Sequence, residues 1–326
     1  MTDPLTLARE LAGSGDLPGA ASAYDRAYAR GFDVAAERRD LLDRLAVEEH
    51  GIRFRYVPAG TFLMGSTHGE PDESPVHPVT LDAYWIAETP MTWAAYCDLM
   101  GWEPPPAGLP AEPGFHLYEQ NKIRLQYCES ETLHASDWHA HIPEESMFGR
   151  PPRADAERPW RYDAKPMVSV GWQDAEDLCA RLSTSDVHYT LPTEAEWEKA
   201  ARGGLAGRRY PWGDDPPTPD RCDFDRFGEF AIRAPLTFQP NGYGLYAISG
   251  TVWEWTSDWY DALSYSDGTP SGGEERVLRG GSWSDCADAV TVSFRMSRRS
   301  GSWKDAGWGD HFAPNIGFRL CRRAPT

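Results

Sequence analysis

The sequence predicts an α+β fold of short, irregular elements that follows a short N-terminal helical extension. Residues 1–50 are rich in Ala and Leu, with apolar residues at helical spacing, and this pattern predicts a helical hairpin. Across residues 51–326, short apolar runs instead alternate with Gly- and Pro-containing turns, which is typical of strands joined by loops. The chain of 326 residues contains 14 Trp, 30 Gly and 27 Pro, a mixture that suits irregular backbone fixed by large aromatic side chains.

The helical extension is expected to contain two or three short helices. Gly13 and Gly31 lie where such helices would end, because glycine readily adopts the left-handed conformation at a helix C-terminus. The hairpin resembles a single tetratricopeptide-type unit, but a solenoid needs several such repeats. We therefore expect residues 1–50 to pack on the main domain, with the docking of a partner protein as the alternative.

The first half of the main domain predicts strands, one helix and a long insertion. Residues 52–66 predict a strand, a Pro-Ala-Gly turn and a second strand. Residues 77–102 predict a further strand, followed by a helix that Thr92 caps. Residues 103–165 contain Pro, Gly and His with weak periodicity, so we interpret them as an insertion of loops and short elements.

The second half of the main domain begins with two predicted helices. Residues 165–183 predict a strand and then a helix with one apolar face. The clearest helix signal is "YTLPTEAEWEKAARGG" (189–204), in which Thr193 and Glu196 form a capping box and two glycines end the helix. The segments that follow, from "RRYPWGDD" onward, predict turn–strand units in which most Trp side chains pack in the core.

Composition excludes several classes of partner. The chain has 32 Lys and Arg against 50 Asp and Glu, and its net charge of −18 argues against binding nucleic acid or anionic lipid. The N-terminus lacks the cationic start and apolar run of a secretory signal, and no apolar run is long enough to predict a membrane span. The six cysteines are scattered, so we expect reduced thiols in a cytoplasmic protein.

Eight short sequence motifs in the main domain, here called words, resemble motifs of one protein family. They are similar to the formylglycine-generating enzymes, also called sulfatase-modifying factors, and occur in that family's order over about residues 52–323. The resemblance implies a C-type-lectin-like fold, an irregular α+β domain held by Trp and Gly turns. The words are "VPAGTFLMGS", "HPVTLDAYWIAETPMT", "PMVSVGWQDAEDLCARLS", "YTLPTEAEWEKAARGG", "RRYPWGDD", "NGYGLYAISGTVWEWTSDWY", "RVLRGGSW" and "IGFRLCRR".

The resemblance places a catalytic pair in the segment "GGSWSDCADAVTVSFRMSRRS" (280–300). Family members that oxidise a peptidyl cysteine use two cysteines, five residues apart, which bind copper(I) as thiolates. Here the second position is Met296, and the first is Thr291, or Val290 if the turn is one residue shorter. Because neither position carries a thiol, the sequence predicts that formylglycine formation by the copper mechanism is absent.

The resemblance also implies two calcium positions, and both have departures. One would use Ala247, Gly250, Val252 and Glu254, but Ala247 stands where the family has an asparagine, so one oxygen ligand is lost. The other lies near "CDFDRFGEF", where Asp223 and Phe224 match and the following loop is shorter. We therefore expect no cofactor, with calcium as the alternative and Glu254 as a buried acid satisfied by backbone N–H groups.

A histidine group in the insertion is a further metal candidate. His134, His139 and His141 lie close together in sequence, and the last two would share one side of a strand. Their spacing matches no strong zinc or iron motif, so we expect a solvated loop and not an iron or copper site.

Two functional hypotheses follow from these residues. The first is a domain repurposed to bind a protein, peptide or small-molecule ligand through residues 284–315, a long segment between two apolar strand words. The second is a metal-dependent oxidase or oxygenase that acts in a biosynthetic or protein-modification pathway. We favour the first, because Trp and Arg are typical of binding surfaces. The predicted binding residues are Ser293, Arg295, Met296, Arg298, Trp303, Trp308, Asp310 and His311.

Overall fold

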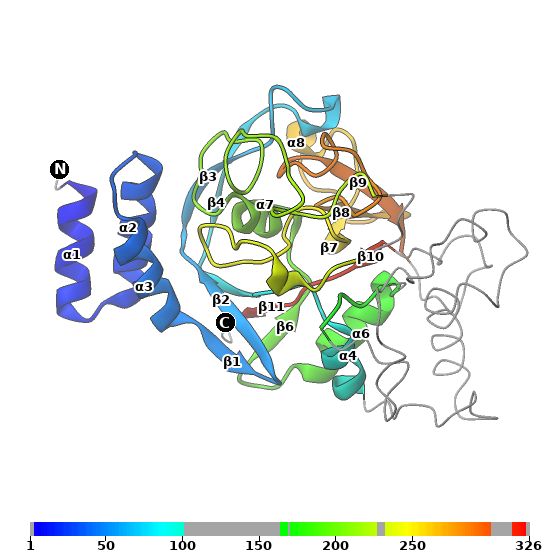
Figure 1. Cartoon of the computed structure of the whole chain (residues 1–326), viewed down its shortest axis with the longest axis horizontal. Helices are drawn as coiled ribbons and strands as arrows, with labels where there is room; N and C mark the ends of the chain where they lie inside the picture. Colours follow the sequence, from blue (N-terminus) through cyan, green and yellow to red (C-terminus); the bar gives the residue numbers. More distant parts are fainter. Residues whose placement is uncertain (1–2, 101–163, 169, 227–231, 301–314, 324–326) are drawn as a thin grey trace, which may run out of the picture.

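Figure 1 shows the computed structural model of the chain. The structure describes residues 3–100, 164–168, 170–226, 232–300 and 315–323, and all structural statements refer to these residues. The helical extension lies at one side of a rounded main domain in which strands, short helices and long connections are interleaved. This arrangement confirms the predicted irregular α+β class.

Three helices form the N-terminal extension, as predicted. α1 (Pro4–Ser14) and α2 (Leu17–Ala29) each begin at an aspartate, Asp3 or Asp16, whose carboxylate accepts a backbone N–H of the first turn. α3 (Ala35–Leu45) then leads into the main domain. The aspartate caps and the proline in the first turn of α1 and of α2 explain why such short helices begin where they do.

The extension packs on the main domain, as the sequence predicts. Tyr24 of α2 and Leu41 of α3 are buried in the same apolar cluster as Trp197 and Tyr243 of the main domain. Arg38 of α3 is 2% exposed and donates hydrogen bonds to the carbonyl oxygens of Gly242 and Gly203. Apolar burial and a buried guanidinium therefore both hold the helices in place.

The largest sheet brings together distant parts of the chain. Its strand order is β1-β2-β5-β11-β6, with β1 (Val47–Glu49) and β2 (Ile52–Val57) forming a hairpin. β2 pairs with β5 (Tyr84–Ala87), and the late strand β11 (Cys321–Arg323) lies between β5 and β6 (His188–Thr190). A strand near the end of the chain thus completes the sheet that the first strands begin.

A second sheet carries the segment of functional interest. It consists of β7 (Trp253–Trp259), β8 (Glu275–Arg279) and β9 (Arg295–Arg299), which are antiparallel, and β10 (Ile316–Gly317), which runs parallel to β7. The remaining elements are β3 (Gly60–Met64), η1 (Pro71–Glu73), β4 (His77–Leu81), α4 (Trp93–Met100), α6 (Trp172–Leu182), α7 (Glu194–Arg202), η4 (Pro235–Thr237) and α8 (Ser264–Asp267).

Helix α7 lies at the centre of the main domain (Figure 1). The predicted capping box is present, since Thr193 Oγ1 accepts from the Glu196 N–H while the Glu196 carboxylate accepts from the Thr193 N–H. Gly203 ends the helix at φ 58°, as predicted for a left-handed cap. Trp197 is fully buried in the core. Among the described residues, none of the helices is long and apolar enough to cross a membrane.

Candidate functional site

The connection between β8 and β9 contains Ser293. The first position of the family's catalytic pair also lies in this connection. After Arg279, Gly280 and Gly281 adopt φ values of 101° and 70°, in the left-handed region that favours glycine. A Cβ atom on Gly281 would lie 2.6 Å from the carbonyl oxygen of Ala289. The Gly-Gly turn therefore allows the chain around Ala289 to pass close to the end of β8.

Arg279 fixes the backbone of this connection through hydrogen bonds. Its side chain is completely buried, and it donates to the carbonyl oxygens of Val292 at 2.7 Å and Ser293 at 2.8 Å. The same guanidinium pairs with Glu198 of α7 at 2.5 Å and with Glu194 at 3.3 Å. Because a guanidinium presents five donors in a rigid fork, one side chain joins α7, β8 and the 292–293 backbone.

Residues of this connection form one wall of a pocket of about 420 Å³, which we name the Thr291 pocket. Thr291, Ser293 and Phe294 provide that wall, and the turn at 65–73 and the loop at 207–214 provide much of the rest. Leu63, Val76 and Phe294 add apolar surface. The volume is within the range of small-ligand pockets.

The arginines of the Thr291 pocket are already paired with acids. Arg208 pairs with Asp214 at 2.5 Å, and Arg209 contacts Asp288. Arg202 pairs with the buried Glu198 at 2.6 Å. The two remaining acids of the lining, Glu70 and Glu73, make no ion pair with any residue that the structure describes. The unbalanced charge of the lining is therefore negative.

Glu73 is the most unusual of these side chains. It is 1% exposed, and its Oε1 accepts from the Glu70 N–H at 2.9 Å. Its Oε2 is buried and has no hydrogen-bond partner among the described residues. Leaving a buried carboxylate oxygen without a donor costs free energy. The lining of the pocket therefore includes one buried acceptor without a donor among the described residues.

Arg295 does not lie on the surface, contrary to the prediction. Its side chain is completely buried, because it forms a two-bond ion pair with Glu194 at 2.7 and 3.1 Å. It also donates to the carbonyl oxygen of Asp72, beside Glu73. Arg295 therefore fixes the backbone next to Glu73 and makes no exposed contact.

The other predicted binding residues separate into three groups. Ser293 is 4% exposed and lies in the wall of the Thr291 pocket. Met296 is half-buried against the main apolar core, and Arg298 is half-buried on β9. Residues outside the described part of the chain are Trp303, Trp308, Asp310 and His311, together with the metal candidates His134, His139 and His141.

The two positions of the family's thiol pair have different surroundings here. Thr291 lies at the pocket, with its Oγ1 accepting from the Phe294 N–H at 3.2 Å. Met296 packs its side chain against the core. Of the cysteines that the structure describes, Cys286 is exposed, whereas burial raises the pKa of the Cys222 thiol to about 12. A buried thiol of this kind stays protonated and is a poor metal ligand.

Glu254, the main calcium candidate, is satisfied differently from our prediction. It is 1% exposed, and its two oxygens accept from Arg319 Nε and Nη2, each at 2.7 Å, while the Trp197 indole N–H donates at 2.8 Å. Side chains, and not backbone N–H groups, therefore satisfy it. Val252 N–H donates to the Gly250 carbonyl at 2.8 Å. A guanidinium already neutralises this acid, so the residues present do not fit calcium.

Asp223, at the second calcium position, is likewise neutralised by arginine. The side chain is fully buried, and its Oδ1 accepts from Arg226 at 2.8 Å and from Arg233 at 2.7 Å. Its Oδ2 accepts from the Arg233 backbone N–H at 3.0 Å. Phe224 is half-buried beside Cys222. This site does not fit a calcium ion either, since both carboxylate oxygens are engaged.

We therefore expect the stability of the protein to be independent of calcium. The melting temperature should be the same in millimolar calcium and in excess chelator, because arginines occupy the carboxylates of both positions. A site saturated at a hundred times its Kd would stabilise the fold by about 2.7 kcal/mol. Differential scanning calorimetry measures this directly. A rise of several degrees with calcium, absent with magnesium, would contradict the expectation.

Several residues of the site were missed by sequence reasoning. Glu73, Arg279 and Arg202 were not predicted, although each contributes to the pocket or to its support. A usable signal existed for Arg279, because a charged residue between apolar strand positions in "RVLRGGSW" implies a buried partner. Glu73 has no such signal, since it lies in the polar stretch "HGEPDESP".

The sequence of this chain is similar to those of known proteins. Residues 47–324 match the family described as sulfatase-modifying factor enzyme 1-like domain. A formylglycine-generating enzyme of Streptomyces coelicolor is 34% identical over 82% of this chain and 88% of its own length. A protein of Mus musculus named inactive C-alpha-formylglycine-generating enzyme 2 is 31% identical, over 82% of this chain and 85% of its own.

Solved structures share the fold. PvdO from Pseudomonas aeruginosa superposes with a TM-score of 0.59 at 21% identity, over 85% of this chain and 97% of that one. Treponema denticola variable protein 1 gives a TM-score of 0.57 at 20% identity, over 84% and 95% of the two chains. These likenesses confirm the predicted C-type-lectin-like architecture of the main domain.

Proposed function

The chain belongs to the sulfatase-modifying factor family, and from this we propose that its domain binds a ligand through the Thr291 pocket without converting cysteine to formylglycine. The ligand is a peptide, a protein segment or a small molecule that presents a basic group. The observation that carries the proposal is the buried Glu73 carboxylate with one oxygen unpartnered in the pocket lining.

The residues at the two positions of the thiol pair argue against the oxidation of cysteine by this chain. That reaction, as the resemblance implies, depends on a pair of thiolates that bind copper(I). Thr291 offers a hydroxyl, a hard donor, and Met296 a thioether that cannot become a thiolate. Relatives named inactive are about as similar to this chain as those named enzymes. The family fold therefore persists in proteins without the activity.

The lining of the Thr291 pocket supports a basic ligand. Its arginines are paired within the chain, so Glu70 and Glu73 leave the lining negative. Apolar atoms of Leu63, Val76 and Phe294 suit the aliphatic stem of a lysine or arginine side chain. The net charge of −18 adds long-range attraction for a basic partner.

The oxidase hypothesis has less support than the binding proposal. Within the described residues, no group of three or more His, Cys, Asp or Glu side chains is arranged to hold a metal ion. The hypothesis then depends on His134, His139 and His141, which lie outside those residues. One equivalent of iron or copper that is lost on replacing these histidines would support it over the binding proposal.

Binding is tested with a charged ligand and its neutral analogue. We expect N-acetyl-arginine amide to bind, and N-acetyl-citrulline amide, which has the same shape without the charge, to bind at least about ten-fold more weakly. Glu73→Gln should remove the preference, and Glu48→Gln, an exposed control on β1, should keep it. Ligand-observed NMR gives both affinities. Equal binding of the two compounds would disprove the proposal.

The same protein provides the activity control. Incubation of a cysteine-containing sulfatase-type peptide with the protein, copper and oxygen should leave the peptide mass unchanged in mass spectrometry. Formation of formylglycine at a rate above that of copper alone would overturn the proposal, whatever the result of the binding measurement.

A further inference from the structure

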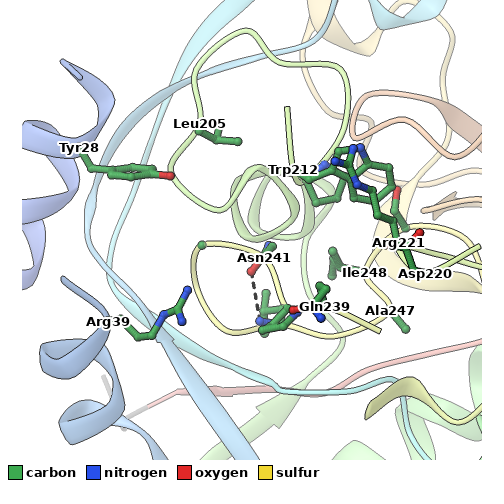
Figure 2. Close-up of a pocket in the computed structure, with 15 residues that line it drawn as sticks. Tyr28, Arg39, Leu205, Trp212, Asp220, Arg221, Gln239, Asn241, Ala247 and Ile248 are labelled. Carbon is green, nitrogen blue, oxygen red and sulfur yellow. Dashed lines mark hydrogen bonds between the residues drawn. The ribbon is translucent and has the colours of Figure 1, made fainter. Parts of the chain in front are cut away.

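A second cavity lies where the helical extension meets the main domain, and we name it the junction pocket (Figure 2). Its volume is about 490 Å³. Tyr28 of α2 and Arg39 of α3 line it from the extension, and the loops at 205–221 and 239–249 line it from the main domain. It is separate from the Thr291 pocket, because the two linings share no residue.

The lining of the junction pocket combines apolar and aromatic side chains. Leu205, Leu245 and Ile248 provide apolar surface. Figure 2 shows Tyr28 and Trp212 on different sides of the cavity, one from each part of the protein. Trp212 stacks on Tyr210 with the ring planes 4° apart, so its position is fixed before any ligand arrives.

Two polar side chains in the lining are already satisfied by the protein. The Asn241 side chain donates to the carbonyls of Ala200 and Ala201 and accepts from two backbone N–H groups. The Trp212 indole N–H donates to the carbonyl oxygen of Asp215 at 2.9 Å. These groups hold the walls and are not available to bind a ligand.

Two arginines of the lining are candidates to bind a ligand, and they lie at opposite sides of the cavity in Figure 2. Arg221 reaches Asp215 through Nη2 at 3.2 Å, but its buried Nη1 has no hydrogen-bond partner among the described residues. Arg39 is exposed, points toward the cavity, and makes no ion pair within the part of the chain that the structure describes. Asp220 is the acid among the described lining residues, and Asp215, just outside the lining, pairs with Arg221 at 3.2 Å, so Arg39 carries the unpaired positive charge at this pocket.

We propose that the junction pocket binds a small, elongated dicarboxylate with an apolar body. One carboxylate accepts from Arg221 and the other from Arg39, and the body lies on the apolar residues beside Tyr28 and Trp212. Hydrogen bonds from arginine to carboxylate are among the strong ones in proteins. The net negative charge of the chain is screened over about 10 Å in ordinary buffers, so distant acids act only weakly on a ligand in this pocket.

This ligand would bridge the helical extension and the main domain. Arg39 belongs to the extension and Arg221 to the main domain, so the complete site exists only when the two are docked. Ligand binding should therefore raise the melting temperature, because a ligand that binds only the docked state stabilises it.

The test uses the full chain with terephthalate, benzoate and terephthalamide, which have two, one and no carboxylates on the same ring. Isothermal titration calorimetry should show terephthalate binding about ten-fold more tightly than benzoate, with terephthalamide not binding. Arg39→Gln should reduce the affinity for terephthalate to that for benzoate. Arg44→Gln, also exposed on α3 but outside the pocket, should leave it unchanged.

Arg221→Gln should weaken the binding of terephthalate to the same extent. A melting temperature equal to that of the unsubstituted chain will show that this variant is folded. Three results would overturn the proposal: no binding of terephthalate at millimolar concentration, equal binding of terephthalate and terephthalamide, or wild-type affinity in both arginine variants. None of these results depends on the Thr291 pocket.

Discussion

Replacing Glu198 by Gln is expected to destabilise the protein by about 3–5 kcal/mol, because the change removes the buried carboxylate that two buried arginines share. Glu198 is completely buried between Arg279 at 2.5 Å and Arg202 at 2.6 Å. It also accepts from the Gly65 backbone N–H at 2.8 Å. Glutamine keeps the shape and one acceptor oxygen, but it removes the charge and places an NH2 donor against an N–H donor of a neighbour, so the loss combines both effects.

The effect of this substitution should depend on pH. Although burial itself raises the pKa of Glu198, the charges of Arg202 and Arg279 outweigh it and hold that pKa below its ordinary value of 4.5. A lowered folded-state pKa contributes stability above the unfolded pKa, and this stability is lost as the pH falls through the folded value. The difference between wild type and variant should therefore be full at pH 7 and shrink below about pH 4.5.

Urea denaturation at several pH values measures both effects. Glu37→Gln is the matched control, because Glu37 pairs with Arg9 at the surface, where the two side chains are 43% and 60% exposed. That change should cost less than about 1 kcal/mol. If Glu198→Gln costs no more than Glu37→Gln, the buried network does not stabilise the fold in the way we describe.

Replacing Arg38 by Met is expected to cost about 3 kcal/mol and to loosen the helical extension. Arg38 joins α3 to Asp25 of α2 at 2.6 Å and to the carbonyls of Gly203 and Gly242. Its guanidinium also lies 4.5 Å from the ring centre of Tyr243. Methionine fills the space but leaves these acceptors without a donor.

Limited proteolysis with urea denaturation distinguishes local from global effects. In Arg38→Met, cleavage between α3 and β1 should become faster, and Arg44→Met on the exposed side of α3 should resemble wild type. An Arg38→Met protein with unchanged proteolysis and less than about 1 kcal/mol of lost stability would mean that apolar packing alone docks the extension.

Features that depend on neighbours in sequence could be predicted from the sequence alone. The capping box at Thr193 and Glu196 and the glycine end of α7 require only a few consecutive residues, and both are present. The family words establish the architecture, and residue identity at Thr291 and Met296 establishes the lack of a thiol pair. The same reasoning predicted Arg295 at the surface, because local pattern does not reveal a distant acid.

Only the tertiary structure decided which distant charges meet and where cavities form. Glu254 and Arg319 are 65 positions apart, and Arg279 and Glu198 are 81 apart, yet each pair is buried and in direct contact. Burial of a charge is tolerated only where a partner of opposite charge lies within hydrogen-bond distance. No periodicity encodes that distance, because it arises when the sheets and α7 pack together. The pockets arise in the same way, since their walls come from segments that meet only in the folded chain.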